Sequence, residues 1–116
     1  MTQSEYFDAF ESLCREELAT THAKNRDYAS SSDPFLNFHL IERLTGGRVT
    51  TEDGILVRIS DKLSRIGNLL DGHKPDVVDE KLDDTLLDLA VYAKILRIYL
   101  RTMRDTQQSQ VVEAHP

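Results

Sequence analysis

The stretch that decides the fold is residues 76–105, DVVDEKLDDTLLDLAVYAKILRIYLRTMRD. Its apolar residues recur every three or four positions, which predicts one long helix. A helix with apolar residues on two sides is expected to be covered on both. One side carries Leu87, Val91, Ile95 and Ile98, and the opposite side carries Val78, Leu82, Leu86, Leu89, Ala93, Leu96 and Leu100.

Three further helices are predicted upstream, over residues 4–23, 34–44 and 51–70. In the first, Ser4 is placed to cap the start. Its apolar residues fall within an arc of about 80° at 100° per residue, which predicts a buried face. The residues of that arc are Phe7, Phe10, Cys14 and Leu18.

Boundary signals support the second and third predicted helices. Asp33 is expected to cap a helix that has Pro34 at its first position, and Gly46 and Gly47 are expected to stop it. Thr50 and Asp53 have the spacing of a capping box, with aspartate in place of the usual glutamate. The sequence therefore predicts an all-α fold.

In detail, the prediction is a four-helix bundle-like domain over residues 1–105, with the longest helix last. Its core is expected to be completed by homo-oligomerisation, as a dimer or a higher assembly. Residues 106–116 have no usable periodicity and are predicted to be a flexible tail. The one strand candidate, residues 48–50, is too short to count.

The composition limits the classes of function. The chain has 116 residues, 14 basic and 20 acidic, with a net charge of -6, which argues against coating polymeric nucleic acid. A small phosphorylated ligand needs only two or three local cations.

No apolar run approaches the roughly 20 residues of a membrane span. The acidic start is unlike a secretory signal, and the single Cys14 fits a reducing compartment. The cytoplasm is the predicted location, the host cytoplasm if the chain is phage-encoded.

An acidic stripe on the last helix is the first candidate site. Glu80, Asp84 and Asp88 are spaced i, i+4, i+8 and repel one another, which bound Mg²⁺ would offset. A solvated helix start favoured by the helix dipole is the alternative, but Asp88 lies three turns into the helix. Glu17, at the edge of the first apolar arc, is a further metal-ligand candidate. A surface glutamate lying over apolar stems is about equally compatible with that position.

The third helix offers cations opposite this stripe. Lys62 and Arg65 are candidates for phosphate binding, with Arg58 beside them, and Asp61 is a candidate for a metal or base contact. The alternative is an ordinary wet face, or a set of salt bridges to the acidic stripe.

A polar loop is predicted after the first helix, and it is dense in side chains that read small ligands. Lys24 offers a phosphate contact, Asn25 hydrogen bonds in both directions, and Tyr28 a stacking surface. Tyr92 on the last helix is expected to pack against its neighbours or to stack on a base. The phenylalanines at 35 and 38 are expected in the core.

Four segments together resemble a known family. They are KNRDYA (24–29), DPFLNF (33–38), VRISDKLSRIGNLL (57–70) and DEKLDDTLLDLAVYA (79–93). This ordered set resembles the phage and prophage nucleotide modification associated domain proteins. Those are similar in style to the all-α nucleoside triphosphate pyrophosphatases of the MazG and dimeric dUTPase type. The resemblance covers residues 16–100.

The resemblance implies an oligomeric all-α bundle that handles nucleotides. In MazG-type enzymes, a paired-glutamate motif and a second acidic motif hold Mg²⁺. Glu80 and Asp84 match the second motif, whereas Asp61, Lys62 and Arg65 stand where the first is expected. Positive charge in place of a metal ligand suits phosphate binding without metal-dependent hydrolysis. The residues carried over are Lys24, Asn25, Asp27, Tyr28, Asp61, Lys62, Arg65, Glu80, Asp84, Asp88 and Tyr92.

The sequence thus leaves three hypotheses open. The first is a nucleotide-binding protein that hydrolyses a nucleoside triphosphate, with Asp61, Glu80 and Asp84 catalytic and Mg²⁺ as cofactor. The second is a non-catalytic nucleotide binder that sequesters its ligand, for example to counter a nucleotide signal of the host. The third is an interaction module whose charged helices pair internally.

Overall fold

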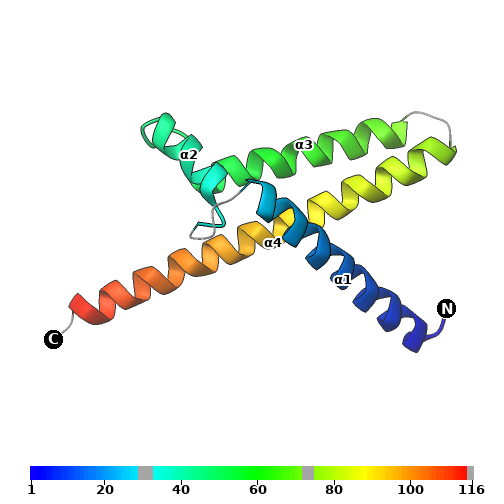
Figure 1. Cartoon of the computed structure of the whole chain (residues 1–116), viewed down its shortest axis with the longest axis horizontal. Helices are drawn as coiled ribbons and strands as arrows, with labels where there is room; N and C mark the ends of the chain where they lie inside the picture. Colours follow the sequence, from blue (N-terminus) through cyan, green and yellow to red (C-terminus); the bar gives the residue numbers. More distant parts are fainter. Residues whose placement is uncertain (29–32, 72–74, 115–116) are drawn as a thin grey trace.

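The computed structural model describes residues 1–28, 33–71 and 75–114, without the side chains of residues 26–28, 75–80 and 110–114. Within these ranges every regular element is a helix, which confirms the all-α prediction. The helices are α1 (Gln3–Tyr28), α2 (Leu36–Leu44), α3 (Thr51–Asp71) and α4 (Pro75–Ala114) (Figure 1).

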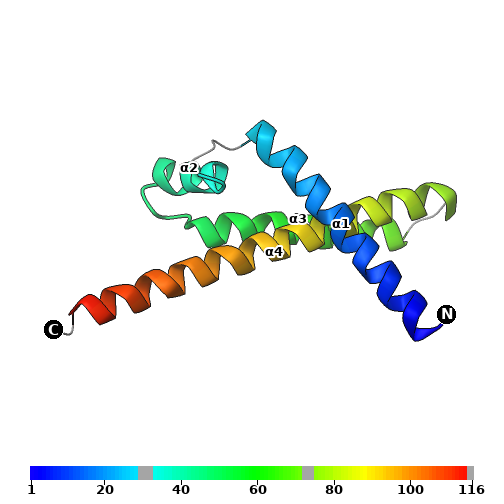
Figure 2. The same cartoon turned by 60° about the horizontal axis from the view of Figure 1, so that its bottom comes forward.

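The helices do not close into a compact bundle. α3 and α4 lie side by side as a hairpin, and the short α2 lies near the start of α3 (Figures 1 and 2). α1 crosses α4 at a steep angle, and its N-terminal half leads away from the hairpin. The radius of gyration is 17.9 Å, against about 13 Å expected for a compact domain of this length.

The tightest packing is at the junction of α2, α3 and α4. Ile55 and Thr51, both on α3, are fully buried, and Tyr99 of α4 is nearly so. The ring of Phe35, just before α2, meets Tyr99 edge-on with centroids 5.4 Å apart. Thr51 Oγ1 donates a hydrogen bond of 2.7 Å to Glu42 Oε2, which satisfies the buried hydroxyl and ties α3 to α2.

Local hydrogen bonds explain where α1 and α3 begin. Asp53 N donates to Thr50 Oγ1 at 3.1 Å and Thr50 N to Asp53 Oδ2 at 3.4 Å, which confirms the predicted capping box. At α1 the reciprocal pair is Thr2 and Glu5, so the prediction of Ser4 as the cap is wrong.

Three predicted helix boundaries are corrected. α1 continues to Tyr28, so Lys24 and Asn25 lie on a helix and not in a loop. α2 begins at Leu36, because the backbone at Asp33 and Pro34 turns before it, with Phe35 N donating to Asp33 Oδ1. α4 continues beyond Asp105 to Ala114.

The predicted burial of two apolar faces is wrong for the single chain. On α1, Phe7 is 62% exposed and Phe10 57% exposed, and Leu18 is also exposed. On α4, Val91 is buried, whereas Leu86 and Leu100 on the opposite side are exposed. In the part of the chain that the structure describes, no helix is long and apolar enough to cross a membrane.

Candidate ligand-binding site

A cavity of about 430 Å³ lies where all four helices approach one another. Ligand pockets in proteins commonly span about 300–1,000 Å³, so the volume suits a small molecule. α1 contributes Thr21, Lys24 and Asn25, and α3 contributes Arg58. The remaining lining residues are Pro34, Asn37, Phe38, Ile41, Val91, Tyr92 and Ile95.

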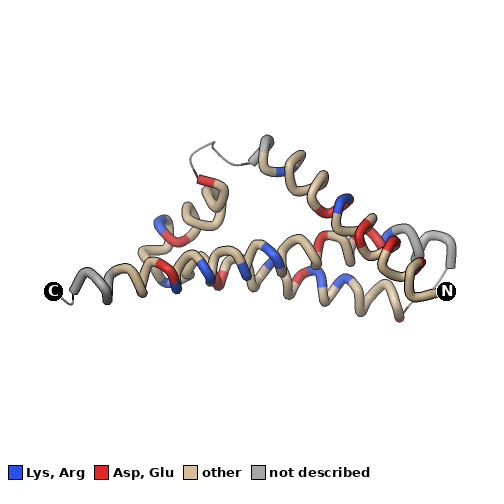
Figure 3. Tube along the Cα trace, turned by 90° about the horizontal axis from the view of Figure 1, so that it is seen from below, with Lys and Arg blue, Asp and Glu red and all other residues tan. Residues whose placement is uncertain are grey.

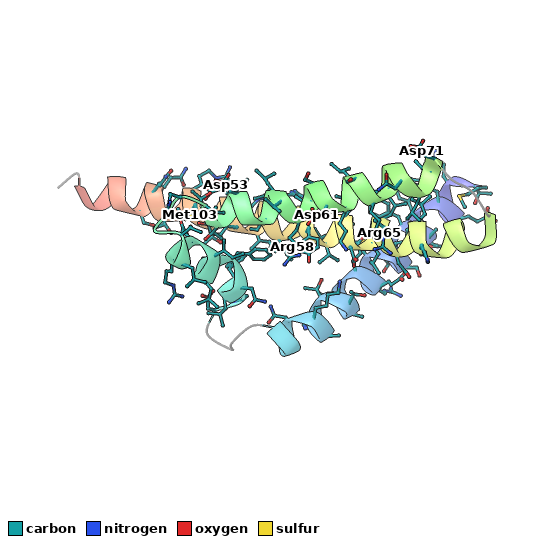
Figure 4. All side chains as sticks on the ribbon, turned by 90° about the horizontal axis from the view of Figure 1, so that it is seen from above. Asp53, Arg58, Asp61, Arg65, Asp71 and Met103 are labelled. Carbon is teal, nitrogen blue, oxygen red and sulfur yellow. The ribbon has the colours of Figure 1, made fainter. Side chains whose placement is uncertain are left out.

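The lining combines three kinds of chemistry. Lys24 and Arg58 bring positive charge from opposite sides, and Figure 4 shows Arg58 on the side of α3 that faces α1 and α2. Asn25 and Asn37 bring amides that donate and accept hydrogen bonds. Phe38, Tyr92 and the aliphatic residues give apolar walls. The lining therefore suits a planar, anionic molecule: the cations can bind its charge, the amides its polar edge and the apolar walls its flat face.

Asp88 organises the charges beside this cavity. Lys24 Nζ donates to its Oδ1 at 2.8 Å, and Lys62 Nζ donates to its Oδ2 at 3.0 Å. Desolvation by partial burial acts to raise the pKa of Asp88, but the hydrogen bonds from Lys24 and Lys62 outweigh it, so the pKa lies below its ordinary value. Asp88 is therefore a carboxylate at neutral pH and holds both lysines in place.

Lys24 is thereby shared between Asp88 and the cavity. An ammonium group has three donors, and Asp88 takes one of them. The bond also joins residues 64 positions apart, on α1 and α4, so it ties these two helices together beside the cavity.

The predicted ligand-binding residues separate into three groups. Lys24, Asn25, Arg58 and Tyr92 line the cavity, although they come from three different helices. Lys62 does not line the cavity and is ion-paired with Asp88, which also binds the cavity-lining Lys24. Asp61 and Arg65 are exposed and make no hydrogen bond or ion pair within the described residues (Figure 4). The side chains of Asp27, Tyr28 and Glu80 lie outside the described residues.

The predicted magnesium ligands do not come together in the part that is described. There, no three His, Cys, Asp or Glu side chains form a group that could hold a metal ion. Glu17 is ion-paired with Lys94 of α4. Asp84 is exposed, and Asp88 already accepts from two ammonium groups. Because the Glu80 side chain lies outside the described residues, magnesium stays a prediction.

Sequence reasoning missed the contribution of α2 to the cavity. Asn37, Phe38 and Ile41 line it from that helix. Phe38 was expected in the core, and its ring also packs against buried Gly54 of α3. Its Cδ1 lies 3.7 Å from the point that a Cβ on Gly54 would occupy, which is ordinary van der Waals contact. The available signal was Asn37, a lone amide between two phenylalanines of a short amphipathic helix.

The chain was compared with models of known families, with curated proteins and with solved structures, and no match was found in any of the three. The resemblance to the phage nucleotide modification family therefore stays a prediction.

Proposed function

We propose that this protein binds a small nucleotide in the cavity between its four helices. The observation that carries the proposal is the joint lining: two cations, two amides and two aromatic rings face one space of about 430 Å³. Lys24 and Arg58 would bind the phosphates, because charge-assisted hydrogen bonds to phosphate are the strongest such contacts available. Asn25 or Asn37 would bind the edge of the base, and Tyr92 its face.

Binding without hydrolysis is favoured by the state of Asp88. Both of its oxygens accept hydrogen bonds from lysines. To become a metal ligand, it would have to give up ion pairs that already lower its pKa. Lys24, which also lines the cavity, would neutralise phosphate charge there, so the arrangement suits a binder better than a metal-dependent hydrolase. The hydrolase, with Glu80 and Asp84 on Mg²⁺, is the competing outcome of the test.

The test is calorimetric titration with a panel of nucleoside mono-, di- and triphosphates, with and without EDTA. Arg58→Ala is expected to weaken binding about 10–100-fold, because a hydrogen bond to a charged group contributes about 1.5–3 kcal/mol. Arg65→Ala is the matched control, since Arg65 is an exposed arginine two turns along α3 that does not line the cavity. Equal loss in both variants, or no binding of any nucleotide, would overturn the proposal.

The hydrolytic alternative has a separate readout. Phosphate release is measured with added pyrophosphatase, Mg²⁺ and each nucleoside triphosphate. No turnover alongside measurable binding supports a non-catalytic binder. Turnover that is lost in Asp84→Ala would establish the hydrolase. Failure to bind, together with loss of folding when Asp88 is changed, would identify an interaction module held by internal ion pairs.

Two further parts of the proposal concern the cellular setting. We infer that the protein acts in the cytoplasm, consistent with the one cysteine, Cys14, which is free and exposed. We also infer that it self-associates, because so much apolar side chain is exposed on the single chain.

A further inference from the structure

The surface area of the chain is too large for a compact monomer. It exposes 8925 Å², whereas a folded monomer of 13.2 kDa is expected to expose about 6,400 Å². The excess, about 2,500 Å², is well above the roughly 800 Å² that each partner covers in a standard stable interface. There is ample area for a second copy to cover.

One face of the α3–α4 hairpin has the pattern of a helix-packing surface. On α3 the residues Leu56, Ser60, Leu63, Gly67 and Leu70 follow one another at spacings of 4, 3, 4 and 3. On α4 the residues Leu82, Leu86, Leu89, Ala93, Leu96 and Leu100 continue the same alternation. This spacing is that of a coiled-coil seam, and neither row contains a charged residue. We call the two rows together the leucine face.

The two rows lie on the same side of the hairpin, away from the cavity. At 100° per residue, the α4 row is centred about 130° from the cavity-lining Val91, Tyr92 and Ile95. By the same measure, the α3 row is centred about 160° from the cavity-lining Arg58. α2 and the C-terminal half of α1, which line the cavity, lie together on one side of the hairpin (Figure 3). The leucine face lies on the other side.

The leucine face is open in the single chain. Leu63 is 54% exposed, and Leu86 and Leu100 are 46% and 47% exposed. Small residues interrupt the rows: Ala93 is exposed, and a Cβ on Gly67 would meet nothing within 4 Å. Leucines flanking small residues let two helices approach closely, as knobs entering holes.

The charge distribution along α4 selects the orientation of the partner. Asp83, Asp84 and Asp88 lie near the start of α4, together with Lys81, whereas Lys94, Arg97, Arg101 and Arg104 lie farther along it and are followed by Asp105. A parallel partner would oppose like charges. An antiparallel copy with its two-fold axis at Ala93 pairs Leu86 with Leu100 and brings Asp83 near the Arg101 and Arg104 of the second copy.

We propose that a second copy of this chain packs antiparallel on the leucine face and forms a four-helix core with Ala93 at the two-fold axis. This proposal rests on the self-association proposed above and is independent of the ligand. It assigns the interface to the side opposite the cavity. Both cavities of the dimer would then open outward, available to ligand at the same time.

The first test is light scattering on the full chain at micromolar concentration. A dimer is expected for the unaltered protein, and Leu63→Glu is expected to give a monomer. Leu13→Glu is the matched control, because Leu13 lies on α1 and is also 54% exposed. A monomeric unaltered chain would overturn both self-association and the interface. A dimer that survives Leu63→Glu and is lost in Leu13→Glu would overturn the interface alone.

A second test covers the case in which Leu63→Glu does not fold. Ala93→Cys in a Cys14→Ser background is expected to form an intermolecular disulfide on mild oxidation, because a residue on the axis meets its own copy within the roughly 4.4–6.8 Å between Cα atoms that a disulfide requires. Ser12→Cys, an exposed position on α1, is the control and is expected to remain reduced. A dimer in which Ala93→Cys does not cross-link would overturn the antiparallel arrangement.

Discussion

The junction of α2, α3 and α4 and the first half of α1 carry similar apolar patterns but differ in burial. At the junction, Ile55 is fully buried and Tyr99 nearly so. On α1, Phe7 and Phe10 lie mostly in solvent, although their spacing is as regular as that of the junction residues. The two regions have similar apolar residues at similar spacing and differ in whether another part of the chain packs against them.

The difference shows what helical periodicity does and does not determine. A row of apolar residues on one face of a helix indicates that this face packs against another element. It does not indicate whether that element belongs to the same chain. Here the junction is covered from within, by the rings of Phe35 and Phe38. The first half of α1 leads away from the hairpin, so its face has no neighbour in the chain (Figure 1).

Truncation at the two regions gives the largest expected contrast. Ile55→Ala is expected to lower the free energy of unfolding by about 2–5 kcal/mol, because it leaves a cavity among packed side chains. Phe10→Ala removes a larger side chain but is expected to cost only about 0.5 kcal/mol, because most of its surface is already in water.

Urea unfolding followed by circular dichroism measures both values. Val57→Ala, two residues from Ile55 on the same helix and exposed, controls for the change in helix propensity. Equal losses at Ile55 and Phe10 would contradict the contrast, since they would mean that α1 is covered as thoroughly as the junction.

The two capping boxes give a smaller contrast of the same kind. Thr50→Ala removes the cap of α3 next to fully buried Thr51 and is expected to cost about 1 kcal/mol. Thr2→Ala removes an equivalent cap from α1, where the first turn can fray without disturbing packed residues, so we expect less than about 0.5 kcal/mol. The same urea titration compares them, and a reversal of the order would count against the junction as the stable part.

The sequence predicted the elements of the fold better than their partners. Local hydrogen bonding and backbone geometry determine the four helices of the described residues, the capping box at Thr50 and the glycine stop after α2, and the structure confirms all three predictions. The end of α1 was misplaced because Lys24 to Tyr28 are polar without containing a helix breaker. The polarity of Lys24 and Asn25 is explained by the neighbouring cavity and by Asp88, neither of which is local in sequence.

The candidate site was predictable residue by residue but not as a set. Ligand contacts are commonly made by lysine, arginine, amide and tyrosine side chains, which made these residues candidates from the sequence. One cavity is lined by four of them, Lys24, Asn25, Arg58 and Tyr92. Which carboxylate pairs with which cation depends on how α1 crosses α4. The stripe that suggested a metal site is in part an ion-pair site, because Lys24 and Lys62 converge on Asp88.

The smallest expected effect concerns the bond that ties α1 to the hairpin. Asp88 has a pKa below its ordinary value in the folded chain, because the hydrogen bonds of Lys24 and Lys62 outweigh the effect of desolvation. Its ion pairs therefore stabilise the fold above the unfolded pKa of about 3.9. That contribution is lost as the pH falls through the lower folded pKa, since the unfolded state then binds the proton more readily.

The stability difference between the unaltered chain and Asp88→Asn is thus expected to be largest at neutral pH and to shrink as the pH falls from about 5 toward 3. Asp84→Asn is the control, because it removes a neighbouring carboxylate, one turn away, that makes no ion pair within the described residues. Thermal unfolding across this pH range measures both. A difference at Asp88 that stays constant or grows on acidification would show that the two lysines do not hold this carboxylate, and would remove the link between the cavity and the crossing of α1 over α4.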